Sequence, residues 1–418
     1  MKSDTVGSPG LWESGCGPAY PAVAVDGPYV RVFAESRGET MPRGPWLWTL
    51  LAVVACGTPA DDKDAETGAP DDSAAPLPDY REWTPDSAGP FRAGHTVVEV
   101  TYSPSSGEGS RSIPVHAWYP TASTEGEEVV HEGIFPDAEA LGEAMAARAS
   151  HEGGHPVLIH SHGSQGYAGN SAFLHAHFAS HGWVVLVPDH LGNTLTDNDD
   201  PRTTAHYIHR PEDLSAALDA ASSGAFSAVG LSDLSVDRVV ASGHSFGVYT
   251  MWAIAGGTFD PALVEAACAG GGALGPDCTE TEKAAFAAGL GDERVIATIP
   301  MAGSIKRDIF GDSGHASVDT PMLAMSGTND PVGAESQFED SPEVPLTWID
   351  IEGACHQTFG LGTCDTLDTE EGFVLVESYA LSFARVHLLG DDSAEAVGRV
   401  DGTLTDERVA WRSHVYGD

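Results

Sequence analysis

The chain contains a serine in a setting that favours nucleophilic chemistry. Ser245 is the centre of a G-H-S-F-G pentapeptide, which follows an apolar, β-branched run at 237–242 and precedes a mostly apolar stretch at 248–256. Strand, G-x-S-x-G and helix in this order are typical of a nucleophile elbow, a sharp turn that exposes the serine hydroxyl. An ordinary glycine-rich turn is the alternative, but glycines at both ends suit the elbow because side chains there would clash with the flanking elements. The elbow residues beside the serine are Gly243, His244 and Gly247.

A serine hydroxyl needs a base to accept its proton and an acid to orient that base. In enzymes built on this elbow, the chain order is serine, acid, histidine. Asp330 follows an apolar run that predicts a strand, and His356 follows the next such run. Because the carboxyl ends of parallel strands meet at one edge of a sheet, we predict a catalytic triad of Ser245, Asp330 and His356. The alternative acids are Asp308 and Asp312, and the alternative role for Asp330 is to cap a turn.

Acyl transfer also needs hydrogen-bond donors for the developing oxyanion. The segment H-S-H-G-S-Q-G follows the third predicted strand, and we assign the backbone N–H groups of Ser164 and Phe246 as donors. His160 and His162 in this segment suggest a metal, but alternate positions on a strand point to opposite faces. We therefore interpret them as positioned loop histidines, and the sequence predicts no metal and no cofactor.

Hydrophobic patterning predicts the elements that position these residues. Short apolar runs predict strands at 95–102, 113–118, 156–161, 183–188, 238–242, 294–299, 322–325 and 346–351. Helical patterns lie at 172–181, 211–222, 245–255, 281–288 and 369–389. The first two strands resemble an antiparallel pair, and the later, near-continuous apolar runs are typical of parallel strands covered on both faces. The sequence thus predicts an α/β fold with a mostly parallel eight-stranded sheet and helices on both faces, the layout of α/β hydrolases.

Some details of this layout rest on single patterns. Pro211, followed by two acidic residues, predicts a helix start. His175 and His177 are expected on the surface of the helix at 172–181. Two segments, 129–152 and 256–292, are additional to the strands and helices of the α/β-hydrolase layout. Their positions predict lid-like insertions.

Four cysteines downstream of the N-terminal region form two close pairs. In an exported protein these predict the disulfides Cys268–Cys278 and Cys355–Cys364, although sequence alone allows three pairings. Structural zinc is disfavoured, because neither pair has the short gap of common zinc sites. The second bridge would hold the loop of His356 in place.

The first 55 residues are typical of a targeting segment rather than of folded protein. A basic M-P-R is followed by a short apolar run at 46–55 that ends in V-V-A before Cys56. This is the pattern of a secretory signal, too short to span a bilayer. It resembles a bacterial lipobox, which implies lipidation of Cys56. We expect the true start at Met41, with residues 1–40 a mis-called extension, and export with a lipid anchor in the bacterial cell envelope, periplasmic or outer. A buried apolar segment is the alternative.

Residues 56–90 are acidic, rich in alanine and proline, and nearly lack large apolar side chains, so we expect a disordered tether there and a catalytic domain at 91–418. The whole chain carries 20 basic against 62 acidic residues, a net charge of −42. Repulsion from phosphates excludes nucleic acid as a partner. The acidic run D-N-D-D at 197–200 does not match a known calcium loop, so we interpret it as a solvated loop. We expect a monomer whose only membrane contact is the lipid anchor.

From about residue 94 to residue 356, the chain resembles the bacterial "predicted dienelactone hydrolase" group, which is close to platelet-activating-factor acetylhydrolases and more distant from polyester-cleaving cutinases. The motifs that carry this resemblance, besides the pentapeptide, are V-H-A-W-Y-P at 115–120, S-H-G at 161–163, A-S-H-G-W-V-V at 179–185, P-D-H-L-G-N-T at 188–194 and R-P-E-D at 210–213. The resemblance implies an esterase or lipase that forms an acyl-serine on a small-molecule, lipid or polyester ester. A peptidase or amidase with the same triad, and a non-catalytic surface-binding lipoprotein, remain as alternatives.

The chain departs from these relatives at three places. True dienelactone hydrolases use cysteine where this chain has Ser245, so that name does not give the substrate. The acetylhydrolases take their acid after the sixth strand, where P-M-A-G at 300–303 offers none, and this leaves Asp330 after the seventh. Val248 stands where glycine is common after the pentapeptide.

Overall fold

A computed structural model describes residues 79–107, 109–199, 202–269, 274, 278–304 and 307–416. The predicted signal segment, Cys56, most of the predicted tether and the last acidic residue of the run at 197–200 lie outside the described residues. The described part of the chain belongs to one structural unit.

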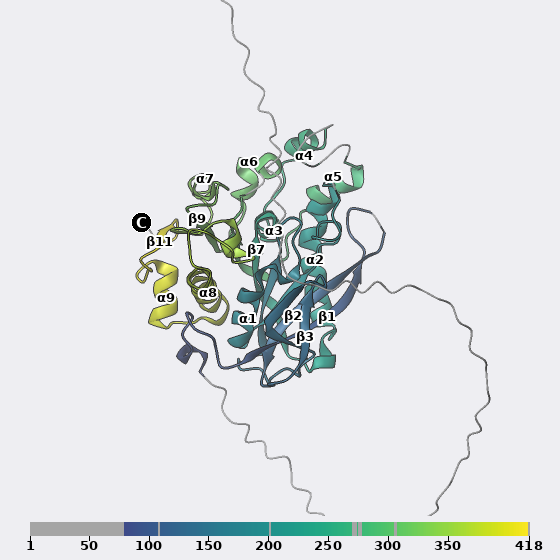
Figure 1. Cartoon of the computed structure of the whole chain (residues 1–418). Helices are drawn as coiled ribbons and strands as arrows, with labels where there is room; N and C mark the ends of the chain where they lie inside the picture. Colours follow the sequence, from purple (N-terminus) through teal and green to yellow (C-terminus); the bar gives the residue numbers. More distant parts are fainter. Residues whose placement is uncertain are drawn as a thin grey trace, which may run out of the picture. The chain divides into compact units, whose positions relative to one another are not determined.

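One mixed sheet runs through the described part of the chain (Figure 1). Its strands are β1 (Arg92–Tyr102), β2 (Arg111–Thr121), β3 (Glu127–His131), β4 (Phe135–Gly142), β5 (His155–Ser161), β6 (Val184–Pro188), β7 (Leu234–His244), β8 (Val295–Met301), β9 (Met322–Gly327), β10 (Leu346–Ile351) and β11 (Val409–Ser413). They lie in the order β11-β10-β9-β8-β7-β5-β6-β2-β1-β4-β3. The run from β10 to β6 is parallel, whereas β2 and β11 are antiparallel to the neighbours at its two ends.

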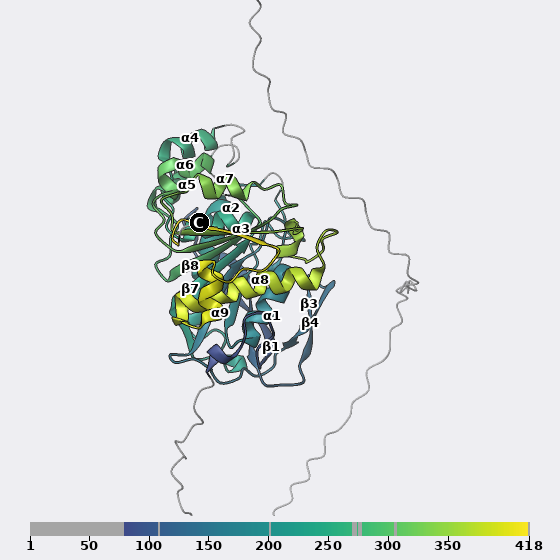
Figure 2. The same cartoon turned by 90° about the vertical axis from the view of Figure 1, so that its left-hand side faces the viewer.

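Helices cover both faces of this sheet, so the fold is α/β. They are α1 (Ala172–Ser180), α2 (Ala205–Ser222), α3 (Phe246–Ile254), α4 (Pro261–Cys268), α5 (Glu280–Ala288), α6 (Arg307–His315), α7 (Ala334–Glu339), α8 (Thr369–Ala384) and α9 (Ala394–Asp401). Short turns of helix are η1 (Tyr80–Glu82), η2 (Ala168–Ser171), η3 (Ser227–Val229), η4 (His356–Phe359) and η5 (Arg385–Leu389). Figure 2 shows α1, α8 and α9 on one face and α2 and α3 on the other. Thr369–Leu389 is long and apolar enough to cross a membrane by length and composition, but it is mostly buried, as expected of a core helix.

The prediction of eight strands was wrong, because the described residues form an 11-stranded sheet. All eight predicted strands are present, and β3, β4 and β11 are additional. These three are short strands at or beside the two edges of the sheet, where partial exposure removes the apolar pattern that marks a buried strand. Because β4 pairs with β1 and β3 pairs with β4, the predicted insertion at 129–152 extends the sheet edge. The insertion at 256–292 forms α4 and α5, and its role as a lid stays a prediction.

Helix α2 begins at Ala205 and has Pro211 in its interior, so the predicted start at this proline was wrong. A proline inside a helix leaves the carbonyl four residues earlier without its N–H donor. That carbonyl belongs to Tyr207, and it accepts a hydrogen bond of 2.8 Å from the Tyr249 hydroxyl of α3. A side chain from the neighbouring helix therefore replaces the missing bond.

Two further expectations differ from the structure. His175 and His177 are buried rather than on the helix surface, because α1 packs against both the sheet and α8. The predicted tether also ends before residue 90. Arg385, which is buried, donates to the carbonyl oxygens of Tyr80 at 2.8 Å and Trp83 at 2.7 Å, and these bonds attach η1 to the domain.

Candidate active site

Ser245 lies in the sharp turn between β7 and α3. Its backbone has φ of 56° and ψ of −113°, a conformation that residues other than glycine rarely adopt. A Cβ added to Gly243 would lie 2.5 Å from the carbonyl oxygen of Gly247, and one added to Gly247 would collide with the carbonyl oxygen of Ser161. The turn therefore requires both glycines and holds the serine on a strained backbone, as the pentapeptide predicts.

The structure brings the three predicted triad residues together. The Nε2 atom of His356 lies 3.0 Å from the Oγ atom of Ser245. On the other side of the ring, Nδ1 lies 3.0 Å from Oδ2 of Asp330. The Asp330 side chain is 0% exposed and that of His356 is 33% exposed. A carboxylate that accepts Nδ1–H leaves Nε2 as the proton acceptor for the serine, which is the geometry of a general base beside a nucleophile.

Of the alternative acids, Asp312 is exposed on α6, and the side chain of Asp308 lies outside the described residues. Asp330 is therefore the carboxylate that the structure joins to His356.

Backbone bonds and a disulfide connect the loops that carry Asp330 and His356. Asn329 N–H donates to the carbonyl of Ala354 at 2.9 Å, which joins the loop after β9 to the loop after β10. The cysteine before His356 forms the Cys355–Cys364 disulfide, with 5.9 Å between the two Cα atoms. The Cys268–Cys278 disulfide is also present, between α4 and the start of α5.

His244 supports His356 from the elbow. Its Nε2–H donates to the carbonyl oxygen of His356 at 3.0 Å. Burial, together with the nearby His356, lowers the pKa of His244 to about 3, so its ring is neutral near pH 7. A neutral donor here fixes the backbone of His356 without adding a second positive charge next to the base.

The predicted oxyanion donors lie on two segments that meet at Ser245. A Cβ on Gly163 would lie 3.1 Å from the Cβ of Ser245, so the loop after β5 passes directly beside the serine. The hydroxyl of Ser164 accepts from Arg202 at 2.9 Å, and that guanidinium lies 4.0 Å from the ring centre of Phe246. Within the described residues, neither predicted amide donates to another backbone carbonyl, so both remain candidates for a ligand.

Arg210 is a site residue to which sequence reasoning assigned no role. Its guanidinium is fully buried; it donates to Oδ1 of Asn193 at 2.9 Å and to the carbonyl oxygen of His162. Burial lowers its pKa to about 9. By holding the His162 carbonyl, Arg210 orients the peptide that leads into the loop beside the serine. The only signal in the sequence was its place in the R-P-E-D motif.

His160 and His162 have separate partners. Nδ1 of His160 lies 2.8 Å from the hydroxyl of Ser242. Nε2 of His162 accepts from the backbone N–H of His190 at 3.0 Å, and its Nδ1 donates to the carbonyl of Gly163 at 2.7 Å. Both rings thus position backbone or side chains around β5.

No model of a known protein family matches this chain, and no curated protein matches it either.

Proposed function

We propose that the protein is a serine hydrolase of the α/β-hydrolase type that cleaves carboxylic esters. One observation carries this proposal: a serine on a strained strand-to-helix turn lies 3.0 Å from a histidine that lies 3.0 Å from a buried aspartate. The order of the strands supports it, since nucleophile, acid and base follow β7, β9 and β10, which belong to one parallel run of the sheet, at their carboxyl ends.

In this mechanism, Ser245 Oγ attacks the ester carbonyl while His356 Nε2 takes its proton. The backbone N–H groups of Ser164 and Phe246 stabilise the oxyanion. The intermediate collapses to an acyl-serine, and His356 returns the proton to the leaving alcohol. A water molecule, deprotonated by the same ring, then attacks the acyl carbonyl; the bond between the acyl carbon and Ser245 Oγ breaks, and His356 returns the proton to Oγ as the acid leaves. Asp330 stays ionised throughout and stabilises the imidazolium that forms twice in each cycle.

The location and state of the protein belong to the same proposal. Two disulfides favour an oxidising compartment, which supports export. The lipid anchor at Cys56 and the monomeric state are proposed from the sequence alone. Mass spectrometry of a membrane fraction that finds unlipidated Cys56, or an intact residue 1–40 segment, would contradict this part.

A fluorophosphonate probe tests the nucleophile directly. We expect stoichiometric labelling at Ser245, with no labelling and nearly complete loss of aryl-ester hydrolysis in Ser245→Ala. Ser223→Ala is the matched control, because Ser223 is exposed at the end of α2 and should leave labelling unchanged. More than a few per cent of activity in Ser245→Ala would refute the assignment.

Matched aryl esters and aryl amides separate the esterase from a peptidase or amidase with the same triad. A panel of esters from acetyl to palmitoyl then gives the acyl preference. Amide turnover equal to or above ester turnover would replace the ester proposal with an amidase. Absence of both activities and of labelling would favour a non-catalytic binding protein.

A further inference from the structure

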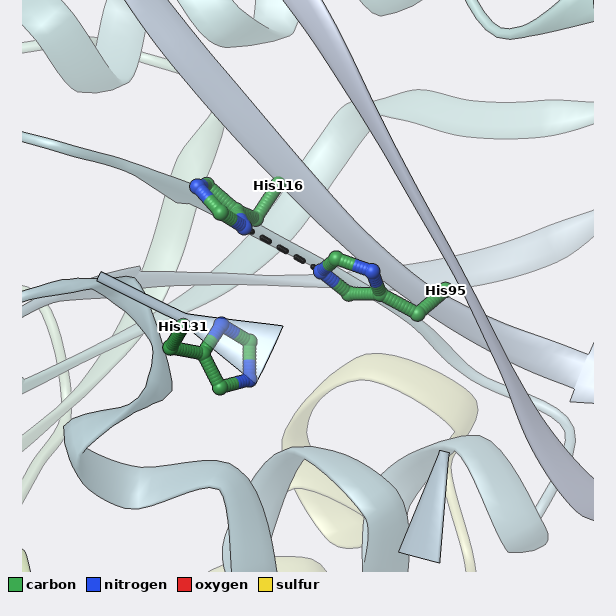
Figure 3. Close-up of side chains that lie close together, drawn as sticks. All are labelled: His95, His116 and His131. Carbon is green, nitrogen blue, oxygen red and sulfur yellow. Dashed lines mark hydrogen bonds between the residues drawn. The ribbon is translucent and has the colours of Figure 1, made fainter. Parts of the chain in front are cut away.

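Three histidines that do not belong to the proposed triad lie close together on strands β1, β2 and β3 of the sheet. His95 lies on β1, His116 on β2 and His131 at the end of β3, and one ring nitrogen of each lies within 4.8 Å of the others. Nε2 of His95 and Nδ1 of His116 are 3.1 Å apart, and Figure 3 shows the His131 ring beside this pair. His95 and His131 are buried and His116 is partly exposed, so the cluster is close to solvent on one side.

Strand register explains how residues far apart in the sequence meet here. In the antiparallel pair of β1 and β2, His95 lies opposite Trp118, and Val97 lies opposite His116. His95 and His116 are therefore diagonal neighbours on one face of the sheet. His131 reaches the same face from the β3–β4 hairpin, and its ring lies 5.4 Å from that of His95.

Two buried carboxylates orient the rings. Oδ2 of Asp189 lies 3.2 Å from Nε2 of His116, and Oδ2 of Asp137 lies 3.3 Å from Nε2 of His131. Each carboxylate accepts Nε2–H, so Nδ1 of its histidine carries the lone pair; in His116 this Nδ1 accepts from Nε2–H of His95 at 3.1 Å, a proton that a bound metal ion would replace. A carboxylate on the far nitrogen is the usual partner of a metal-binding histidine, because it fixes the tautomer and raises the basicity of the ligand.

We propose that His95, His116 and His131 bind one divalent transition metal ion, with Zn²⁺ the ion best suited to three imidazole ligands and an open fourth position. Ligands at about 2.0–2.1 Å in a tetrahedral site lie about 3.3 Å apart, close to the 3.1 Å between His95 and His116. The nitrogen of the third ring has to move by no more than about 1.5 Å, since the three nitrogens lie within 4.8 Å of one another. The two charges of the ion match the two carboxylates behind the rings.

The bound ion connects the hairpin edge of the sheet to the loop beside Ser245. Asp189, behind His116, also accepts the backbone N–H of Ala168 at 2.7 Å. The ring of Tyr167 in the same loop stacks on Phe135 of β4, with 5.0 Å between ring centres. Metal binding should therefore restrain residues 163–171. The site is proposed independently of the hydrolase function, because its test requires no turnover.

The test is a zinc titration of protein without a histidine tag, stripped with a chelator that is then removed. We expect one tight equivalent in the wild type. Asp189→Asn, which removes the partner behind a ligand, should weaken binding by about 10- to 100-fold. His116→Gln, at a partly exposed position, removes a ligand itself and should abolish the tight equivalent. His387→Gln is the matched control, because this histidine lies on η5 and contacts Phe383.

Two further measurements distinguish metal binding at the three histidines from non-specific binding to the many acidic side chains. Co²⁺ should give the intense visible bands of a four-coordinate, nitrogen-rich site in the wild type and not in His116→Gln. Zinc should slow amide hydrogen exchange at 163–171 in the wild type, a measurement that depends on no variant. Absence of a tight equivalent in the wild type, or wild-type affinity in His116→Gln, would overturn the proposal.

Discussion

Replacing Asp330 by asparagine should separate the catalytic role proposed for this side chain from any structural one. The carboxylate is fully buried and lies 3.0 Å from Nδ1 of His356. An asparagine amide in that place donates to Nδ1, which moves the ring proton to Nε2. The nitrogen facing Ser245 then carries a hydrogen and cannot accept the serine proton.

The expected loss follows from this change of tautomer. A triad with an asparagine in place of the acid loses about 10⁴-fold in kcat, equivalent to about 5.4 kcal/mol of barrier at 1.36 kcal/mol per tenfold. Stability should not fall in parallel. Oδ1 of Asp330 has no hydrogen-bond partner among the described residues, so removing the buried charge should leave Tm unchanged or raise it.

The assay compares kcat on an aryl acetate, the rate of fluorophosphonate labelling and Tm for the wild type and two variants. Asp312→Asn is the matched control, since it makes the same chemical change at the exposed alternative acid. Asp330→Asn should lose turnover and labelling rate together and keep its fold. Retention of more than a tenth of kcat in Asp330→Asn, or a comparable loss in Asp312→Asn, would refute the assignment of the acid.

Three further predictions concern pH, space and covalent restraint. Burial, reinforced by the charge of Glu139, raises the pKa of Glu377 from 4.5 to about 8. Between these two pH values the folded protein keeps a proton on Glu377 that the unfolded chain has lost, so the free energy of unfolding falls as the pH rises from 4.5 towards 8. Glu377→Gln should therefore flatten Tm against pH and raise Tm above pH 8; an unchanged slope would contradict the burial argument. Gly163→Ala places a methyl group 3.1 Å from the Cβ of Ser245. It should lower kcat about tenfold or more, while Tm, measured by calorimetry, changes little. Full activity of this variant would show that the loop is free to move. Reducing or mutating the Cys355–Cys364 bridge, a sequence separation of 9, should cost about 2–3 kcal/mol of unfolding free energy from loop entropy, and a denaturant titration that shows no loss would contradict it.

The sequence predicted structure well at places where neighbouring residues along the chain determine the backbone conformation. The elbow is one such place, because a sharp strand-to-helix turn needs glycines at both ends whatever surrounds it. The buried parallel strands β5 to β10 are another, since burial on two faces leaves a near-continuous apolar run. The order of serine, acid and histidine then followed from the order of these strands.

Other features depend on contacts between distant segments. The start of α2 was misplaced, because nothing near Pro211 reveals that a hydroxyl from α3 compensates for its missing bond. The strands β3 and β4 were missed, since the pairing of β4 with β1 and of β3 with β4, rather than an apolar pattern, forms them. The burial of His175 similarly depends on the packing of α1 against the sheet.

The sequence by itself determined the α/β class, the elbow and the three residues proposed for the triad, because periodicity, turn chemistry and chain order are local or one-dimensional properties. Only the tertiary structure decided which carboxylate meets His356, that Arg210 holds the loop beside Ser245, and that three histidines from separate strands share one face. Strand register and side-chain burial determine these contacts, and no spacing along the chain encodes them.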